Sequence, residues 1–160
     1  MPSSLHVRMD YPDFAKAAPS VQAALRAMTR AVEDAGLEKE LTELVKVRVS
    51  QMNGCAFCVQ FHLTLARKLG VPAEKLDLVA AWREAGVYTE RELAALAWAE
   101  IHTDMSRHES TDAAYADLLK HFNATEAVFL TVAIATINTW NRIAVALRFV
   151  PPVPPPASQG

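Results

Sequence analysis

The sequence lacks most of the features that mark secreted, membrane or nucleic-acid-binding proteins. It has two cysteines in 160 residues, too few for a disulfide framework. It has no basic run, because Lys and Arg alternate with Asp and Glu and the net charge is -2, which excludes the usual electrostatic signature of nucleic-acid binding. The N-terminal residues include no apolar signal core, so we expect a cytoplasmic protein.

Long hydrophobic runs and strand patterns are also scarce. The longest apolar-rich stretch, residues 127–137, is too short to span a bilayer, so we predict a buried core helix and no membrane contact. Strand alternation is nearly absent, and helical periodicity dominates. The sequence therefore predicts a single all-α domain, long enough to bury a core without a disulfide or metal.

The predicted organisation is a lead-in over residues 1–18, a helical domain over 19–150 and a flexible tail over 151–160 with five prolines. We expect the tail to be an extended terminal overhang. The last predicted helix is apolar on nearly all sides in its first half, which favours a central position or a subunit interface. About seven helices are predicted, at residues 19–35, 38–52, 55–69, 73–85, 89–106, 112–123 and 125–149.

Cys55 and Cys58 are the most informative pair in the chain. On a helix that begins at Cys55, Cys58 lies about 60° and His62 about 20° from Cys55 around the axis, so the three share one face. The preceding Asn53-Gly54 predicts that the pair lies at a helix N-terminus, where free N–H groups and the helix dipole favour a thiolate. Lowering a thiol pKa by about two units takes about 2.7 kcal/mol and makes the nucleophilic thiolate the main form at pH 7.

Glu43 lies twelve residues before Cys55, on the preceding predicted helix. If the two helices pack antiparallel across the Asn53-Gly54 turn, the Glu43 carboxylate folds back over the cysteines. It then accepts a proton directly, or through water and His62.

The order of these residues resembles the core motif of the AhpD-like branch of the carboxymuconolactone decarboxylase superfamily. Glu43 is followed by eleven residues and then by Cys-x-x-Cys-x-x-x-His at residues 55–62. The lead-in Val-Ser-Gln-Met-Asn-Gly at 49–54 and the segment Ile-Asn-Thr-Trp-Asn-Arg-Ile at 137–143 are similar to that branch too. The resemblance covers roughly residues 38–148.

This resemblance implies an AhpD-like helical fold that assembles as a homo-oligomer, a dimer, trimer or hexamer. It also implies reduction of a hydroperoxide substrate to an alcohol, with a cycle between dithiol and disulfide. Cys58 attacks the peroxide, Cys55 resolves the product, and Glu43 and His62 form the proton relay. The reductant is an external dithiol or a thiol-carrying adaptor protein, and no bound metal, flavin or other cofactor is expected.

Phe57 departs from this pattern, because the characterised alkylhydroperoxidase has a histidine of the site just before the second cysteine. A phenylalanine cannot move protons, so either peroxidase activity is weak or the relay runs through Glu43 and His62 alone. The decarboxylases of the superfamily lack the cysteine pair, which argues against decarboxylation of a lactone.

Two other functions stay open from the residues themselves. One is a general dithiol–disulfide oxidoreductase or redox sensor with little peroxidase activity. The other is a non-enzymatic helical assembly or metal-binding module. A zinc site needs four ligands, so a distant histidine would have to join the two cysteines and His62: His102, His108 or His121.

The remaining polar and aromatic residues of interest are predicted to be structural. Asn138, Asn141 and Arg142 interrupt the apolar last helix, so their polar groups need partners on a neighbouring helix or subunit if they are buried. The three tryptophans are predicted to be core or interface residues: Trp82, Trp98 and Trp140.

Overall fold

A computed structural model describes residues 6–107 and 111–154, and within these ranges it is all-α, which confirms the predicted fold class. His108 and the end of the predicted tail lie outside the described residues. The described part forms nine α-helices and two short 3₁₀ helices, η1 and η2. Their bounds are α1 (Tyr11–Ala17), α2 (Pro19–Asp34), α3 (Lys39–Met52), α4 (Ala56–Lys68), α5 (Ala73–Leu78), η1 (Val79–Ala81), α6 (Trp82–Ala85), α7 (Glu90–Thr103), η2 (Met105–Arg107), α8 (Asp112–Leu118) and α9 (Ala124–Leu147).

Two helices go beyond the seven predicted, and each has a local cause. Helix α1 lies inside the segment expected to be a plain lead-in; it begins at the N-cap Asp10, whose carboxylate accepts a hydrogen bond from the Tyr11 N–H. The predicted helix at 73–85 divides into α5, η1 and α6. The 3₁₀ turn places Val79 and Trp82, which lie three residues apart, on one side, and both side chains are buried.

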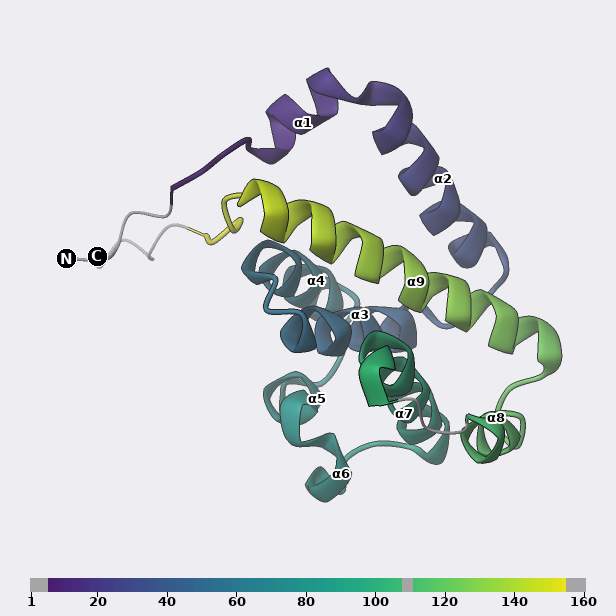
Figure 1. Ribbon diagram of the computed structural model, residues 1–160. Coiled ribbons are helices and arrows are strands. Elements are labelled where there is room, and N and C mark those ends of the chain that lie inside the picture. Colours follow the sequence, from purple (N-terminus) through teal and green to yellow (C-terminus); the bar gives the residue numbers. More distant parts are fainter. Residues whose placement is uncertain (1–5, 108–110, 155–160) are drawn as a thin grey trace, which may run out of the picture.

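Helix α3 forms the centre of the domain. All residues from Leu41 to Val47 are buried, polar ones included, and so are Val49 and Ser50. The helix packs against α4, α7 and α9. Figure 1 shows α9 running diagonally through the molecule, with α2 on one side of it and α3 and α7 on the other.

Helix α9 occupies the central position predicted for the last helix. It has 24 residues and is apolar enough, by length and composition, to cross a membrane, so the expectation that this region is too short was wrong for the whole helix. Its packing is nevertheless that of a core helix, because it contacts α2, α3, α4 and α7. The amides of Asn138 and Asn141 are buried in it and hydrogen-bonded.

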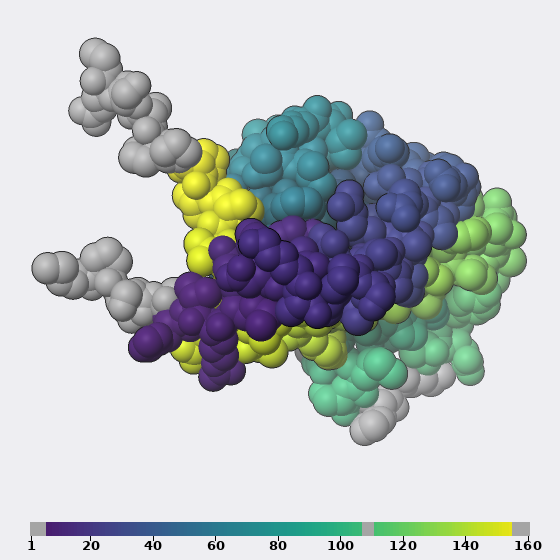
Figure 2. Space-filling view, turned by 90° about the horizontal axis from the view of Figure 1, so that it is seen from above, coloured from purple at the N-terminus to yellow at the C-terminus, as the bar shows by residue number. Residues whose placement is uncertain are grey.

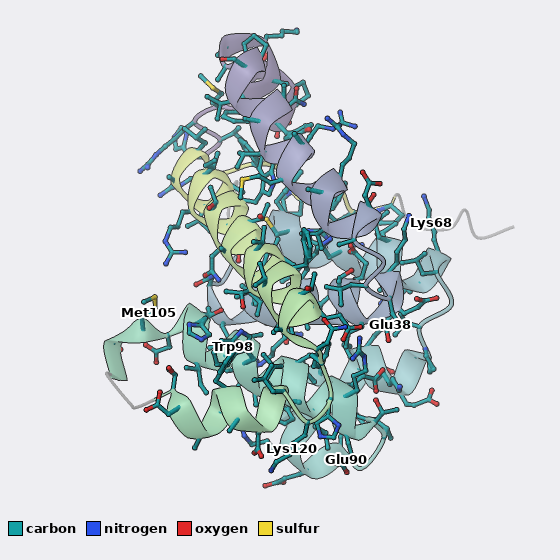
Figure 3. The ribbon with its side chains drawn as sticks, turned by 90° about the vertical axis from the view of Figure 1, so that its right-hand side faces the viewer. Glu38, Lys68, Glu90, Trp98, Met105 and Lys120 are labelled. Atoms are coloured by element: carbon teal, nitrogen blue, oxygen red, sulfur yellow. The ribbon has the colours of Figure 1, made fainter. Side chains whose placement is uncertain are left out.

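Paired side chains fix the other helices to this core. The Arg91 guanidinium of α7 pairs with Glu38 and with Glu126, at N–O distances of 2.9 Å for each. Trp98, labelled in Figure 3, packs between α7 and α9, and its Nε1–H donates to Thr131 Oγ1 at 2.9 Å. These contacts hold α7 against both the start of α3 and the start of α9.

Helices α1 and α2 form an arm that returns to the C-terminal end of α9. The Arg8 and Met9 N–H groups both donate to the Leu147 carbonyl at 3.1 Å. Only Leu25 and Val32 of α2 are buried. Figure 2 looks onto this arm, which crosses the face of the molecule with α3 and α4 along one edge and α9 along the other. The arm therefore acts as one wall of the space that the candidate site opens into.

Candidate functional site

The two cysteines lie at the turn that joins α3 to α4. Gly54 adopts a positive φ of 65°, which glycine reaches at no steric cost, and this turn reverses the chain after Met52. Cys55 is the N-cap of α4, and its Sγ accepts a hydrogen bond from the Cys58 N–H at 3.3 Å. The structure thus places the pair at a helix N-terminus, where the Asn-Gly turn predicts it. Both thiols are free, and their residues are only 1% and 3% exposed.

The thiols differ in acidity because they share one hydrogen bond. A hydrogen bond from the Cys58 thiol, opposed by burial and helped by the Cys58 backbone N–H, lowers the pKa of Cys55 to about 7. The same hydrogen bond, together with burial and the negative charge on Cys55, raises the pKa of Cys58. The pair therefore holds one proton and one negative charge over a range of pH above neutrality.

Glu43 on α3 and His62 on α4 meet directly, as antiparallel packing of the two helices requires. His62 Nδ1 lies 2.6 Å from Glu43 Oε2, and Lys46 Nζ lies 2.7 Å from Glu43 Oε1. Burial alone would raise the pKa of Glu43, but hydrogen bonds and charges from His62 and Lys46 hold this pKa below its usual value. Glu43 is therefore ionised at neutral pH, and the short contact places a proton on His62 Nδ1.

His62 faces Glu43, and among the described residues no hydrogen bond links it to Cys58. With Nδ1 donating to Glu43, the ring keeps Nε2 as the nitrogen that can exchange a proton. Cys58 and His62 line the same cavity. The shared helix face predicted for them thus puts both side chains at one cavity.

A buried amide network from α9 supports the turn beneath the thiols. Asn53 Nδ2 donates to Asn138 Oδ1 at 2.9 Å and to Asn141 Oδ1 at 2.8 Å. Asn141 Nδ2 donates to Ser50 Oγ at 3.0 Å, and the Asn141 side chain also lowers the pKa of both thiols by hydrogen bonding. The two asparagines pair with a neighbouring helix, as predicted, and Asn141 in addition contacts the reactive pair. Arg142 departs from that prediction, because it donates to the backbone and side-chain oxygens of Asn138 on its own helix, at 3.1 Å each.

A cavity of about 850 Å³ opens beside Cys58. Glu43, Lys46 and His62 line it together with Cys58, while Cys55 is not among the described residues that form its wall. The remaining lining residues come from both ends of the described chain and from α2, α4 and α9: Asp10, Tyr11, Pro12, Arg26, Thr29, Arg30, Val32, Glu33, Phe57, Phe61, Leu65, Ala133, Thr136, Ile137, Trp140, Val150 and Pro152.

Phe57 is part of an aromatic wall of this cavity. Its ring stacks on Tyr11 with a centroid distance of 5.8 Å and on Phe61 with a distance of 6.1 Å. It also meets Phe149 edge to face at 5.3 Å. Such pairs contribute about 0.5–1.5 kcal/mol beyond the area they bury. At the position where the resemblance leads one to expect a histidine, this chain therefore has an apolar side chain that supports the arm.

Comparison with known proteins identifies the family. Residues 19–100 match the carboxymuconolactone decarboxylase family. The uncharacterized protein YdfG of Bacillus subtilis (strain 168) is 35% identical over 130 residues, which are 81% of this chain and 88% of YdfG. The chain belongs to this family.

Solved structures place this family member on the AhpD-like branch. ATU0492 of Agrobacterium tumefaciens, a protein of unknown function assigned by name to antioxidant defence as AhpD, is 42% identical; the match covers 92% of this chain and 99% of that one, with a TM-score of 0.86. The debrominase Bmp8 shares the fold with a TM-score of 0.76 but only 20% identity, over 85% of this chain and 73% of its own. Because one fold serves different reactions, the reaction must be argued from the site.

The site of this AhpD-like protein also contains a residue for which the sequence analysis predicts no role. Lys46 is only 8% exposed and neutralises Glu43; its position one turn after Glu43 on the same helix is the signal that could have found it. For the zinc alternative, residues 6–107 and 111–154 contain no group of three or more His, Cys, Asp or Glu side chains placed to hold a metal ion.

The acidity of the pair predicts its reactivity with pH. The thiolate forms as pH rises through the lowered pKa of Cys55, about 7. We therefore expect alkylation of the reduced protein by iodoacetamide to accelerate about tenfold per pH unit below about pH 6 and to level off above about pH 8. The rate is measured by mass spectrometry. The control is the urea-unfolded protein, in which the thiol pKa is about 8.5. A folded profile that matches the unfolded one would contradict this assignment of the thiolate.

Proposed function

We propose that this protein is a thiol-dependent peroxidase that reduces organic hydroperoxides through a Cys55–Cys58 dithiol/disulfide cycle. One observation carries the proposal: an acidic thiol pair lies at a helix N-terminus, and Cys58 opens into a cavity that it shares with the Glu43–His62 pair. Membership of the AhpD-like branch supports the same activity. The cavity supports an organic substrate, because hydrogen peroxide needs no space of this size.

The first step is attack by the Cys58 thiolate on the outer oxygen of the hydroperoxide. The hydrogen-bonded proton between the two sulfurs moves to Cys55, so that the negative charge resides on the sulfur that lines the cavity. The S–O bond forms, the O–O bond breaks, and the leaving alkoxide takes a proton from Nε2 of the protonated His62 ring, while Nδ1 keeps its hydrogen bond to Glu43. The products are the alcohol and a sulfenic acid on Cys58.

The second step closes the disulfide. The Cys55 thiol, which received the shared proton in the first step, gives this proton to His62, and its sulfur attacks the Cys58 sulfur. The S–S bond forms, the S–O bond of the sulfenic acid breaks, and the departing hydroxide takes that proton and leaves as water. The His62 ring then regains from solvent the proton that it gave to the alkoxide. The pair has then given two electrons to the hydroperoxide. An external dithiol, free or on an adaptor protein, returns two electrons by thiol–disulfide exchange and is itself oxidised to a disulfide. The cycle requires a reducing compartment, so the proposal includes a cytoplasmic location.

Self-association is part of the same proposal. Helix α9 carries exposed apolar side chains on the side turned away from the core; Val128 is 58% and Val145 is 47% exposed. A homo-oligomer formed over this face would cover them.

The test is a titration of fully reduced protein with cumene hydroperoxide. We expect one disulfide per chain from one equivalent of hydroperoxide, with one equivalent of alcohol released, read by mass after alkylation and by chromatography. No disulfide with cumene hydroperoxide, but ready oxidation by glutathione disulfide, would replace the proposal with the dithiol–disulfide oxidoreductase. Resistance to both oxidants would leave a structural role.

A further inference from the structure

The cavity beside Cys58 is much larger than the peroxide group that reacts there. Its volume of about 850 Å³ is in the range of pockets that enclose a drug-sized ligand. Apolar side chains line it next to the thiol, with Phe57 and Phe61 stacked in near-parallel planes and Trp140 on the α9 side. Flat apolar walls of this kind favour a ring or a bulky hydrocarbon body in the substrate.

The part of the lining that comes from α2 contributes two guanidinium groups. Arg26 and Arg30 are one helical turn apart and both line the cavity. Both are exposed, and neither has an ion-pair or hydrogen-bond partner within the described ranges 6–107 and 111–154. Like charges at this spacing repel and weaken a helix slightly. An anionic ligand between them would relieve this repulsion.

The other charged groups of the cavity form no ion pair with Arg26 or Arg30 among the described residues. Glu43 is already held by Lys46 and His62. The Asp10 carboxylate accepts the backbone N–H groups of Tyr11 and Val150. Asp10 keeps its negative charge, and so does Glu33, which is the carboxylate that α2 itself contributes to the cavity. The α2 wall thus presents two cations and one anion.

We infer that the substrate of this site is an organic hydroperoxide that carries a carboxylate, with its apolar body along the aromatic wall and its carboxylate between Arg26 and Arg30. This inference rests on the proposed function and names its substrate class. The hydroperoxide end reaches Cys58, and the chemical step and its products are those given above. Arg26 and Arg30 bind and orient the substrate and take no part in the bond changes.

The experiment compares 4-(2-hydroperoxypropan-2-yl)benzoate with cumene hydroperoxide, the same molecule without the carboxylate. The second-order rate constant for disulfide formation is measured for each in a single turnover, so that no reductant is involved. We expect a preference of about fivefold to tenfold for the carboxylate, because two exposed ion pairs contribute modestly. The preference should shrink as salt is added.

Matched charge variants locate the effect. The double variant Arg26→Gln/Arg30→Gln should bring the ratio of the two rate constants to about one. The control Lys16→Gln/Arg67→Gln removes two exposed cations outside the cavity and should keep the ratio. Circular dichroism checks that both variants are folded. Equal rate constants in the wild type, or a ratio that survives in Arg26→Gln/Arg30→Gln, would overturn the inference.

A second readout separates this inference from the proposed function. Calorimetric titration with 4-isopropylbenzoate, which has no peroxide group, reports the anion site alone. Binding that Arg26→Gln/Arg30→Gln weakens about fivefold or more, with no oxidation by either hydroperoxide, would support the anion site and refute the peroxidase. Oxidation by both hydroperoxides at equal rates would refute the anion site and leave the peroxidase standing.

Discussion

Serine at position 58 is expected to stop oxidation by hydroperoxide, whereas serine at position 55 should leave one reactive thiol. In Cys58→Ser the only thiol left is that of Cys55, which is not part of the described cavity wall. We expect its rate of peroxide reaction to fall by about 10³-fold or more, as for the loss of a nucleophile.

The complementary variant behaves differently for an electrostatic reason. The charge on Cys55 and its hydrogen bond raise the pKa of Cys58, so Cys55→Ser removes both causes and makes Cys58 more acidic. This variant should consume one equivalent of hydroperoxide and stop at a sulfenic acid on Cys58, because no second sulfur is present to displace it.

Trapping with dimedone and peptide mass spectrometry distinguishes the two cysteines. The expected adduct is on Cys58 in Cys55→Ser, with little or none on Cys55 in Cys58→Ser. The reverse pattern would assign the attack to Cys55. The lower pKa, and not contact with the cavity, would then identify the attacking cysteine. Unfolded samples of both variants serve as controls for equal trapping efficiency.

The local features of this site could be predicted from the sequence because they depend on neighbours along the chain. Asn53-Gly54 ends one helix, and the residue after such a turn becomes the N-cap of the next, so the position of Cys55 follows from the sequence. The contact between Glu43 and His62 needs only that α3 and α4 pack antiparallel across that short turn.

The features that sequence reasoning missed depend on distant parts of the chain. The arm of α1 and α2 approaches α9 through backbone contacts between residues far apart in sequence. No local sequence pattern therefore predicts the cavity that this arm helps to form. The acidities of the cysteines likewise depend on one hydrogen bond between two sulfurs and on an amide from α9. Periodicity along one helix does not reveal which of the two thiols faces the cavity.

Phe57 illustrates how a departure from a family pattern becomes interpretable only in three dimensions. In the sequence it is a missing histidine and a reason to expect a weaker proton relay. In the structure its ring joins Tyr11 and Phe149, and so connects α4 to the arm and to the segment after α9. The side chain that cannot transfer a proton thus extends the apolar wall beside Cys58.

Replacing Glu43 with glutamine is expected to affect both stability and rate. Glu43 and Lys46 are 6% and 8% exposed, and removing one partner of a buried pair typically costs about 3–5 kcal/mol because the other charge remains buried. Without the carboxylate, the His62 ring also loses the group that orients it. We expect disulfide formation at neutral pH to slow by about 10²-fold, in the range of general acid catalysis.

The pH dependence of this effect has a definite sign. The pKa of Glu43 is lower in the folded protein than in the unfolded chain, where it is about 4.3. The ionised carboxylate therefore stabilises the fold at pH values above the unfolded pKa. This stabilisation is lost as the pH falls through the lower folded pKa. The wild type should therefore lose free energy of unfolding as the pH falls through this acidic range. Glu43→Gln, which cannot titrate there, should lose less.

A double variant separates the effect of the buried charge from the proposed catalytic role of Glu43. Glu43→Gln/Lys46→Met removes both charges of the pair, so it should regain most of the free energy of unfolding, measured in urea, because no unpaired charge is left in the interior. Its rate of disulfide formation should stay low, because His62 still lacks its carboxylate. The exposed Glu74→Gln is the control and should change stability by less than about 0.5 kcal/mol. Recovery of the wild-type rate in the double variant would show that Glu43 acts only by balancing Lys46, and the proton relay would then have to run through His62 without it.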